Sequence, residues 1–428
     1  MTVSRTSAPP LEARPAQTEK FLKKREAILH ASARLFDRDG LKGATFADIA
    51  QSVGMLTHSI TYYYRRKEDL AAACLLRAIE ATQAVAAQAL KAGRPEERIR
   101  AYLSGYADLL AQIATGAHPA LVSFNDIRAL PAPQVDVVFA AYTDMLRSVR
   151  RLLPDEGDRV GRNARAHLLL SLGNGMRGWI GRYETVDYMH AAGRMSDILI
   201  GGLARDAALW REQGGPELGW PRPATGDGAT PDAFLRAATA MVNEQGYRGA
   251  SLDKIAARLN LTKGSFYHHY ASKDELIAAC FERTFDVVRQ TQALAMERRP
   301  GGWDRLSACS RALVRFQMST QGPLLRTTAW NALPADRRAE THASLNRLTE
   351  RFGLFIVDAM IDGATPPLDP SIAAQMVAGM INAASELERW APGITEDSAV
   401  RLYVRPLFLG LLTPEPFETM KPDEEINS

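Results

Sequence analysis

The chain repeats itself once, without a gap, at an offset of 206 residues. Identical pairs include Gly40/Gly246, Gly43/Gly249, Ala44/Ala250, Ile49/Ile255, Ala50/Ala256, Ser59/Ser265, Tyr64/Tyr270, Lys67/Lys273, Leu70/Leu276 and Cys74/Cys280. Conservative pairs, such as Thr45 with Ser251, fill many of the positions between them. One long repeat predicts two copies of a unit large enough to form its own core, and it excludes a solenoid of short repeats.

The composition fits two such units and narrows their setting. A chain of 428 residues exceeds one ordinary domain, and 46% hydrophobic with 24% charged residues is typical of a globular protein. The net charge of only +3 means that any site for nucleic acid must be a local basic surface. Three cysteines provide neither a disulfide framework nor a zinc quartet, which favours a reducing cytoplasm. We find no signal peptide and no stretch long enough to span a membrane, so we expect no membrane partner.

Each copy opens with the same local pattern. Apolar positions recur with the period of a helix, and Gly40 and Gly246 are expected to end that helix with a positive φ. Thr45 and Ser251 are suited to cap a short second helix. A tight turn and a third short helix, ending at tyrosines, follow in both copies. This order predicts a helix-turn-helix, whose last helix enters the major groove of DNA.

These residues resemble a known family. Residues 246–276, GYRGASLDKIAARLNLTKGSFYHHYASKDEL, are similar to the DNA-binding signature of TetR-type transcriptional regulators, and residues 40–70 are a looser match. The full signature spans about 45 residues in each copy, and the two copies cover roughly a fifth of the chain; the remainder resembles the family only in its helical pattern and its length. The resemblance implies an all-α fold of two TetR-like units, each with a helix-turn-helix head and a helical ligand-binding and dimerisation core. It implies double-stranded operator DNA and a small apolar effector as partners, with no cofactor.

The resemblance also places the DNA contacts of the second head. Thr262 is expected to cap the recognition helix, Gly264 to allow its close approach, and Lys273 to bind a backbone phosphate. The full set expected on the DNA side is Thr262, Lys263, Gly264, Ser265, Tyr267, His268 and Lys273. Hydroxyls and lysines would position the head on phosphates, and a few side chains would read base edges.

The first head departs from that pattern. Leu56 stands at the position of the cap, so Thr57 is expected to cap one residue later, and His58 replaces the glycine. The expected contacts are Thr45, Thr57, His58, Ser59, Thr61, Tyr62 and Lys67. Residues 20–70 hold ten Lys/Arg against six Asp/Glu, so this head is expected to depend more on charge and less on base reading. The basic run at 20–25 is either an arm on DNA or a solvated helix start.

Composition and helical patterning divide the rest of the chain. We expect a disordered tail at 1–19, a first head at 20–67, a first core at 68–212, a linker at 213–231, a second head at 232–273, a second core at 274–412 and an acidic tail at 413–428. Helices are expected throughout both cores, one of them over 118–130. Aromatic residues in the cores either form packing or line an effector pocket. The pocket candidates are Phe124, Tyr142, Trp179, Phe316, Trp330, Phe352 and Phe355.

The leading functional hypothesis is a ligand-responsive repressor. The usual homodimer would be fused into an intramolecular pseudo-dimer whose two unlike heads bind an asymmetric operator. The alternatives are a homodimer of fused units with four heads, and an interaction protein with a head that no longer reads DNA. An enzyme is not expected, because metal-ligand spacing, a serine nucleophile elbow and a Walker loop are all missing from the sequence. The Gly-x-Gly-x-x-Gly at 173–178 lies in a helical pattern with no preceding strand, which argues against a dinucleotide site.

Overall fold

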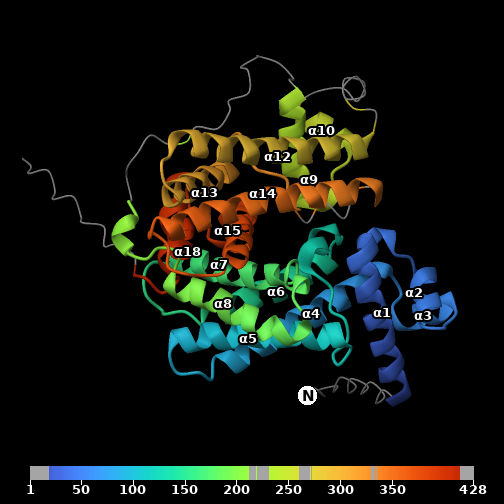
Figure 1. Ribbon diagram of the computed structural model, residues 1–428. Coiled ribbons are helices and arrows are strands. Elements are labelled where there is room, and N and C mark those ends of the chain that lie inside the picture. Colours follow the sequence, from blue (N-terminus) through green and yellow to red (C-terminus); the bar gives the residue numbers. More distant parts are fainter. Residues whose placement is uncertain are drawn as a thin grey trace, which may run out of the picture.

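The computed structural model describes residues 19–211, 218, 231–259, 270, 272–327, 329, 333 and 335–414. The expected tail at 1–19, linker at 213–231 and acidic tail at 413–428 therefore lie almost entirely outside the described residues. Every regular element in the described ranges is helical, as the sequence predicts. Figure 1 shows the helices of the first unit in blue and green and those of the second in yellow to red.

The first unit begins with three head helices, followed by long core helices. The head holds α1 (Glu19–Gly43), α2 (Phe46–Ser52) and α3 (Thr57–Tyr63). The core holds α4 (Lys67–Ala89), α5 (Pro95–Thr115), η1 (Phe124–Ala129), α6 (Gln134–Arg150), α7 (Arg159–Met176), η2 (Ile180–Arg182), η3 (Thr185–Asp187), α8 (Tyr188–Gly201) and η4 (Ala207–Leu209). The helix expected over 118–130 is wrong in its first half, because the chain is extended until η1 begins at Phe124.

The second unit repeats this order. Its described head helices are α9 (Pro231–Gly249) and α10 (Leu252–Arg258). Its core holds α12 (Lys273–Arg298), α13 (Gly302–Met318), α14 (Ala335–Ile361), α15 (Pro370–Ala383), η6 (Ala384–Glu386), α16 (Leu387–Trp390), α17 (Glu396–Ala399), the π-helical turn η7 (Val400–Val404) and α18 (Arg405–Leu409). Elements such as α2 and α10, or α4 and α12, start at positions that are equivalent in the sequence repeat.

The repeat is preserved in fine detail. Gly40 and Gly246 both break their helix with a φ of 71°, a left-handed conformation that glycine adopts without steric cost. The thiols of Cys74 and Cys280 lie 3.7 and 3.6 Å from the equivalent carbonyl oxygens of Leu29 and Leu235. Burial raises the pKa of these thiols, to about 12 and about 11 respectively. Both cysteines therefore serve as small packing groups that tie the first head helix to the first core helix.

Helix α4 is the central helix of the first core. The expectation that no stretch is long enough to span a membrane is wrong for this helix, which among the described helices is long and apolar enough by length and composition alone. Half of its most apolar segment is buried inside the protein, and the helix packs against α1, α5 and α6. Buried core helices of globular proteins can have the same length and apolar composition, and the contacts of α4 are those of a core helix.

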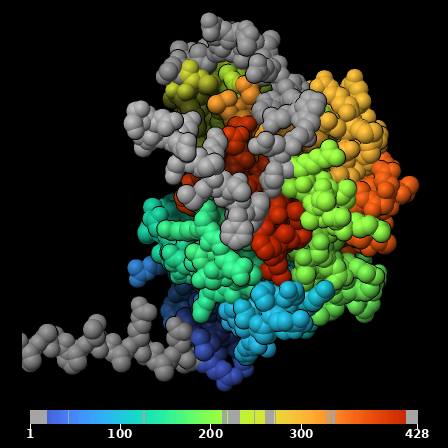
Figure 2. Space-filling model, turned by 90° about the vertical axis from the view of Figure 1, so that its left-hand side faces the viewer, coloured from blue at the N-terminus to red at the C-terminus, as the bar shows by residue number. Residues whose placement is uncertain are grey.

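The last helices of the two units pack against each other in the middle of the molecule (Figure 1). Helix α7 contacts α15, α16 and η7, and α8 contacts α15 and α18. Figure 2 shows α18, in red, bordered by the green surface of the first unit. A single hydrophobic cluster runs from the first head through both cores, whereas the second head and the start of α12 form a separate cluster.

Close backbone approach at this contact depends on glycine. Gly379 of α15 leaves room for Leu172 of α7, because an added Cβ would lie 3.0 Å from Leu172 Cδ2. Gly173, its sequence equivalent, faces Tyr102 of its own unit instead. Both Gly173 and Gly175 lie inside α7, so the glycine motif at 173–178 is part of a helix and the turn after it.

Candidate nucleic-acid interface

Helix α3 lies beside α2 at the outer edge of the first head in Figure 1, and several of its polar residues are exposed. Its inward residue Ile60 is fully buried, which fixes the orientation of the helix. Four of the residues expected to contact DNA are exposed together on the opposite side: Thr57, His58, Thr61 and Tyr62. Ser59 is half-buried, and the ring of Tyr62 is 76% exposed. A short helix held on one apolar residue, with its polar face free, is suited to enter a groove.

Thr45 and Thr57 have different roles in this head. Thr45 caps α2 in a reciprocal capping box: Asp48 N donates to Thr45 Oγ1 at 3.2 Å, and Thr45 N donates to Asp48 Oδ2 at 2.9 Å. The expectation that Thr57 caps α3 is wrong, since Leu56 occupies the N-cap position and Thr57 is the first helical residue. Leu56 makes no side-chain capping bond, and it is 68% exposed.

The two equivalent lysines are held within their heads. Lys67 Nζ donates to the carbonyl oxygen of Ala44 at 2.9 Å, just before α2 begins. Lys273 Nζ lies 4.2 Å from the centre of the Tyr247 ring, a cation–π contact. Each lysine therefore links the start of a long core helix to the head.

The basic run at 20–25 is helical. It forms the first turns of α1, where Lys23 pairs with Glu19 at 2.6 Å, so it is a solvated helix start and not an extended arm. Phe21 packs against Tyr63 and Tyr62 of α3, with ring centroids 4.8 and 6.0 Å apart. This aromatic contact places the start of α1 beside the exposed face of α3.

Two serine caps are found in the described part of the second head. Ser251 caps α10 by accepting from Lys254 N at 3.2 Å, and Ser272 caps α12 by accepting from Glu275 N at 3.2 Å. Six of the expected DNA contacts lie outside the described residues: Thr262, Lys263, Gly264, Ser265, Tyr267 and His268.

A cavity of about 600 Å³ lies between the two cores and is lined by residues of both. Four of the expected pocket residues line it: Phe124, Tyr142, Trp179 and Phe352. The expectation is wrong for Phe316 and Phe355, which are buried as packing residues of α13 and α14 and do not reach the cavity. Trp330 lies outside the described residues. The cavity therefore belongs to the pair of units and not to one core alone.

Each head is tied to the cavity wall by the same repeat position near the end of its first helix. In the first head, Asp37 accepts from Ser123 N at 2.8 Å and pairs with Arg177. In the second head, Asn243 accepts from Arg326 N at 3.1 Å and donates to Leu324 O at 2.9 Å. Both side chains fix the stretch of chain that covers the cavity to the helix that carries the head.

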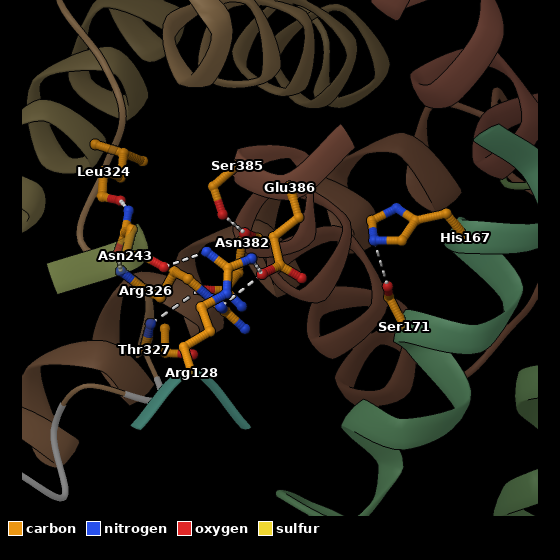
Figure 3. A network of polar contacts seen from close by, with 10 residues as sticks. All are labelled: Arg128, His167, Ser171, Asn243, Leu324, Arg326, Thr327, Asn382, Ser385 and Glu386. Atoms are coloured by element: carbon orange, nitrogen blue, oxygen red, sulfur yellow. Dashed lines mark hydrogen bonds and ion pairs between the residues drawn. The ribbon is translucent and has the colours of Figure 1, made fainter. Parts of the chain in front are cut away.

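A charged cluster joins the two units beside the second head (Figure 3). Arg128 of η1 donates to the carbonyl oxygen of Asn243 and to Glu386, and Arg326 donates to Glu386 at 2.7 Å. Burial favours the neutral form of Glu386, but Arg326 and Arg128 outweigh it and hold the pKa of Glu386 below its ordinary value. Burial lowers the pKa of Arg128, and the adjacent Arg326 adds to this effect. The carboxylate is therefore ionised and shared by two guanidinium groups.

The sequence did not predict this charged cluster, nor the contacts that Asp37 and Asn243 make at their equivalent positions. A signal for the latter was present, because Asp37 and Asn243 are equivalent in the repeat and are both polar near the end of an amphipathic helix. No comparable signal marks Arg128 and Glu386, which are far apart in the sequence and belong to different units.

The comparisons with known proteins agree with the geometry of the first head. The family model described as bacterial regulatory proteins, tetR family, matches twice, at residues 28–74 and 234–280. The TetC protein of transposon Tn10 from Escherichia coli is 34% identical over 60 residues, which is 14% of this chain and 30% of TetC. The negative transcriptional regulator IcaR of Staphylococcus epidermidis is 34% identical over 55 residues, which is 13% of this chain and 30% of IcaR. The chain thus matches about a third of the length of these relatives.

Solved structures align with about one unit of the chain. PfmR from Thermus thermophilus, a TetR-family regulator, is 20% identical with a TM-score of 0.34, covering 40% of this chain and 95% of PfmR. AibR, solved with isovaleryl coenzyme A and operator DNA, is 18% identical with a TM-score of 0.34, covering 41% of this chain and 97% of AibR.

The helix-turn-helix head, its repetition and the helical cores are the features expected of TetR-type regulators. The two family matches fall on the two heads, at the positions where the sequence repeats. The matches place a TetR-type DNA-binding head in each half of the chain, so the chain carries two such heads in tandem.

Proposed function

We propose that this regulator is a ligand-responsive repressor that binds DNA as an intramolecular pseudo-dimer. The observation that carries the proposal is the contact of α7 and α8 with α15 and α18 within one chain. In this arrangement the faces that would pair two subunits already cover each other. The two heads would then occupy successive major grooves, about 34 to 36 Å apart.

The operator is proposed to be asymmetric, because the two heads differ where they would read bases. Thr57, His58, Thr61 and Tyr62 of the first head correspond to Lys263, Gly264, Tyr267 and His268 of the second. Ser59 and Ser265 alone are identical among the expected contacts on the third helices. Different donors and acceptors at equivalent positions select different base pairs, so each half-site would have its own sequence.

We retain the domain boundaries and DNA contacts expected from the sequence as part of this proposal. The effector would occupy the cavity between the cores and alter the spacing of the heads. A cytoplasmic location and a non-enzymatic role accompany the proposal, in line with the regulators that the chain resembles.

Selection of DNA from a random pool with the purified full chain tests this function. The expected product is a site with two unlike half-sites, bound by one chain. Light scattering with and without that DNA separates the pseudo-dimer from a homodimer with four heads. A perfect palindrome bound by one chain would overturn the asymmetric operator, and loss of all salt-dependent DNA binding would favour the interaction protein.

Replacing Lys273 with alanine should weaken DNA binding on every sequence. If its ammonium binds one phosphate, the slope of log K against log salt falls in magnitude by about one. Lys263→Ala should in addition change the preferred bases of the second half-site. Binding isotherms at several salt concentrations provide the measurement. Lys91→Ala is a matched control, since it removes the same charge from an exposed residue that belongs to neither head and lies just beyond the end of α4, about 35 Å along that helix from the first head. An unchanged slope in Lys273→Ala would contradict the phosphate contact.

A further inference from the structure

The charges that line the cavity do not balance. Among the residues that the structure describes, four arginines line it, against two carboxylates, Asp37 and Glu386. Arg177 pairs with Asp37, and Arg182 donates to the amide oxygen of Asn346 at 2.8 Å. The remaining two, Arg128 and Arg326, share Glu386. This part of the cavity wall therefore carries an excess positive charge.

The excess lies in a poorly hydrated place. The side chains of Arg128, Arg326 and Glu386 are only 14%, 19% and 16% exposed, and all three face the cavity. Nearby Arg389 adds a positive charge and Glu244 a negative one, and both act on Arg128. Burying a charge without a partner is costly, so an anion placed here would be bound favourably.

An aromatic wall adjoins the arginines. Tyr142 packs between Phe124 and Trp390, with ring centroids 5.4 and 5.1 Å away. All three rings line the same cavity as the arginines. The site thus combines a cationic end with an apolar one, and its volume of about 600 Å³ lies within the ordinary range for small-molecule sites.

We propose that the effector is an apolar carboxylic acid, bound once per chain in the shared cavity, with its carboxylate on Arg128 and Arg326. This inference deepens the proposed repressor function and rests on it for the meaning of the ligand. Charge-assisted bonds from guanidinium to carboxylate would orient the acid, and its apolar body would lie against the aromatic wall.

The same site reaches the second head directly. Arg128 donates both to Glu386 and to the carbonyl oxygen of Asn243, which lies in α9. A carboxylate that binds Arg128 competes with this carbonyl and weakens the hold of the first unit on α9. The acid would therefore loosen the second head while the Asp37 contacts of the first head remain.

Calorimetric titration with a series of straight-chain acids, from hexanoate to palmitate, tests the ligand class. Matched alcohols and amines of the same chain lengths serve as controls. We expect at least one acid to bind with one site per chain. It should bind at least about tenfold more tightly than its matched alcohol, because the alcohol cannot form the charge-assisted bond to the arginines. Binding of no acid, an alcohol or amine that binds as tightly as its acid, or two sites per chain would each overturn the proposal.

Two substitutions have opposite expected effects on the acid. Arg326→Gln should weaken binding of the acid about tenfold and leave binding of the alcohol nearly unchanged. Glu386→Gln removes the carboxylate that competes for the arginines and should increase the affinity for the acid. Arg182→Gln is the matched control, since this arginine lines the same cavity with Asn346 as its partner, and it should have little effect. Weaker acid binding in Glu386→Gln, or equal losses in Arg326→Gln and Arg182→Gln, would contradict the assigned site.

Hydrogen exchange measures the effect on the second head without DNA. Saturating acid should speed amide exchange in α9 and leave α1 unchanged. Acid binding with unchanged α9 exchange would overturn the coupling to the head. Because the titration and the exchange need no operator, failure of DNA binding would count against the repressor function and leave the ligand assignment standing.

Discussion

Substituting Gly202 with valine is expected to disrupt the pairing of the two units. Gly202 has a φ of +82°, and an added Cβ would lie 2.5 Å from Leu409 C and 2.6 Å from Phe408 O, both in the backbone of the other unit. The clash falls where Leu203 N and Ala204 N both donate to Phe408 O at 2.9 Å. The strain of a non-glycine residue at this φ and ψ and the overpacking each cost roughly 1 to 3 kcal/mol, so we expect a loss of about 3 kcal/mol in unfolding free energy. Thermal unfolding and small-angle scattering would report the loss and the separation of the cores.

Another glycine of the same helix provides the control. An added Cβ on Gly193 would meet nothing within 4 Å, and Gly193 lies in the interior of α8. Gly193→Ala should therefore raise stability slightly, by about 0.5 to 1 kcal/mol, through helix propensity. If the chain binds DNA as the proposed pseudo-dimer, DNA affinity should fall in Gly202→Val, because this contact would then set the spacing of the heads. It should stay unchanged in Gly193→Ala. A wild-type melting temperature for Gly202→Val would show that the units do not pair through α8 and α18.

The features that sequence predicts correctly here are local ones. The positive φ of Gly40 and Gly246 and the caps by Thr45 and Ser251 depend on a few neighbouring residues, and each is found as expected. The all-α fold follows in the same way from helical periodicity. The repeat adds a second, independent copy of each local signal, which is why the architecture of two units could be predicted.

The cavity and its charged wall could not be predicted, because they depend on contacts between distant residues. Helical spacing cannot distinguish Phe352, which lines the cavity, from Phe355, which packs elsewhere. The sequence also favours a helix over 118–123, but Arg77 donates to Ala120 O at 2.6 Å and Ala120 N donates to His30 at 2.8 Å. These tertiary bonds hold the segment extended, and they override local propensity.

Acidification from pH 7 to pH 5 is expected to destabilise the contact between the units through His167. This residue of α7 is buried, its ring stacks on Tyr403 of η7 with centroids 5.7 Å apart, and its Nε2 lies 3.2 Å from Ser171 Oγ (Figure 3). Burial lowers the pKa of His167 to about 4, although Glu386 acts in the opposite direction. The unfolded chain, with an ordinary histidine pKa of about 6.5, therefore binds the proton first. Stability is fully present above pH 6.5 and falls as the pH drops toward 4.

The size of the effect and its origin can both be measured. At about 1.4 kcal/mol per pKa unit, His167 accounts for about 3 kcal/mol over the whole window, with about 2 kcal/mol lost by pH 5. Burial also lowers the pKa of the less buried His30, which adds a smaller loss of the same sign.

Denaturant unfolding at pH 7.5, 6.5, 5.5 and 5.0 should show this decline in the wild type and a flatter profile in His167→Leu. The exposed His190 of α8 supplies the control, since His190→Leu should keep the wild-type slope. The range ends at pH 5 because Glu386, whose pKa is lowered, stabilises the fold only while ionised and adds its own loss at lower pH. An undiminished slope in His167→Leu would assign the acid sensitivity to other groups.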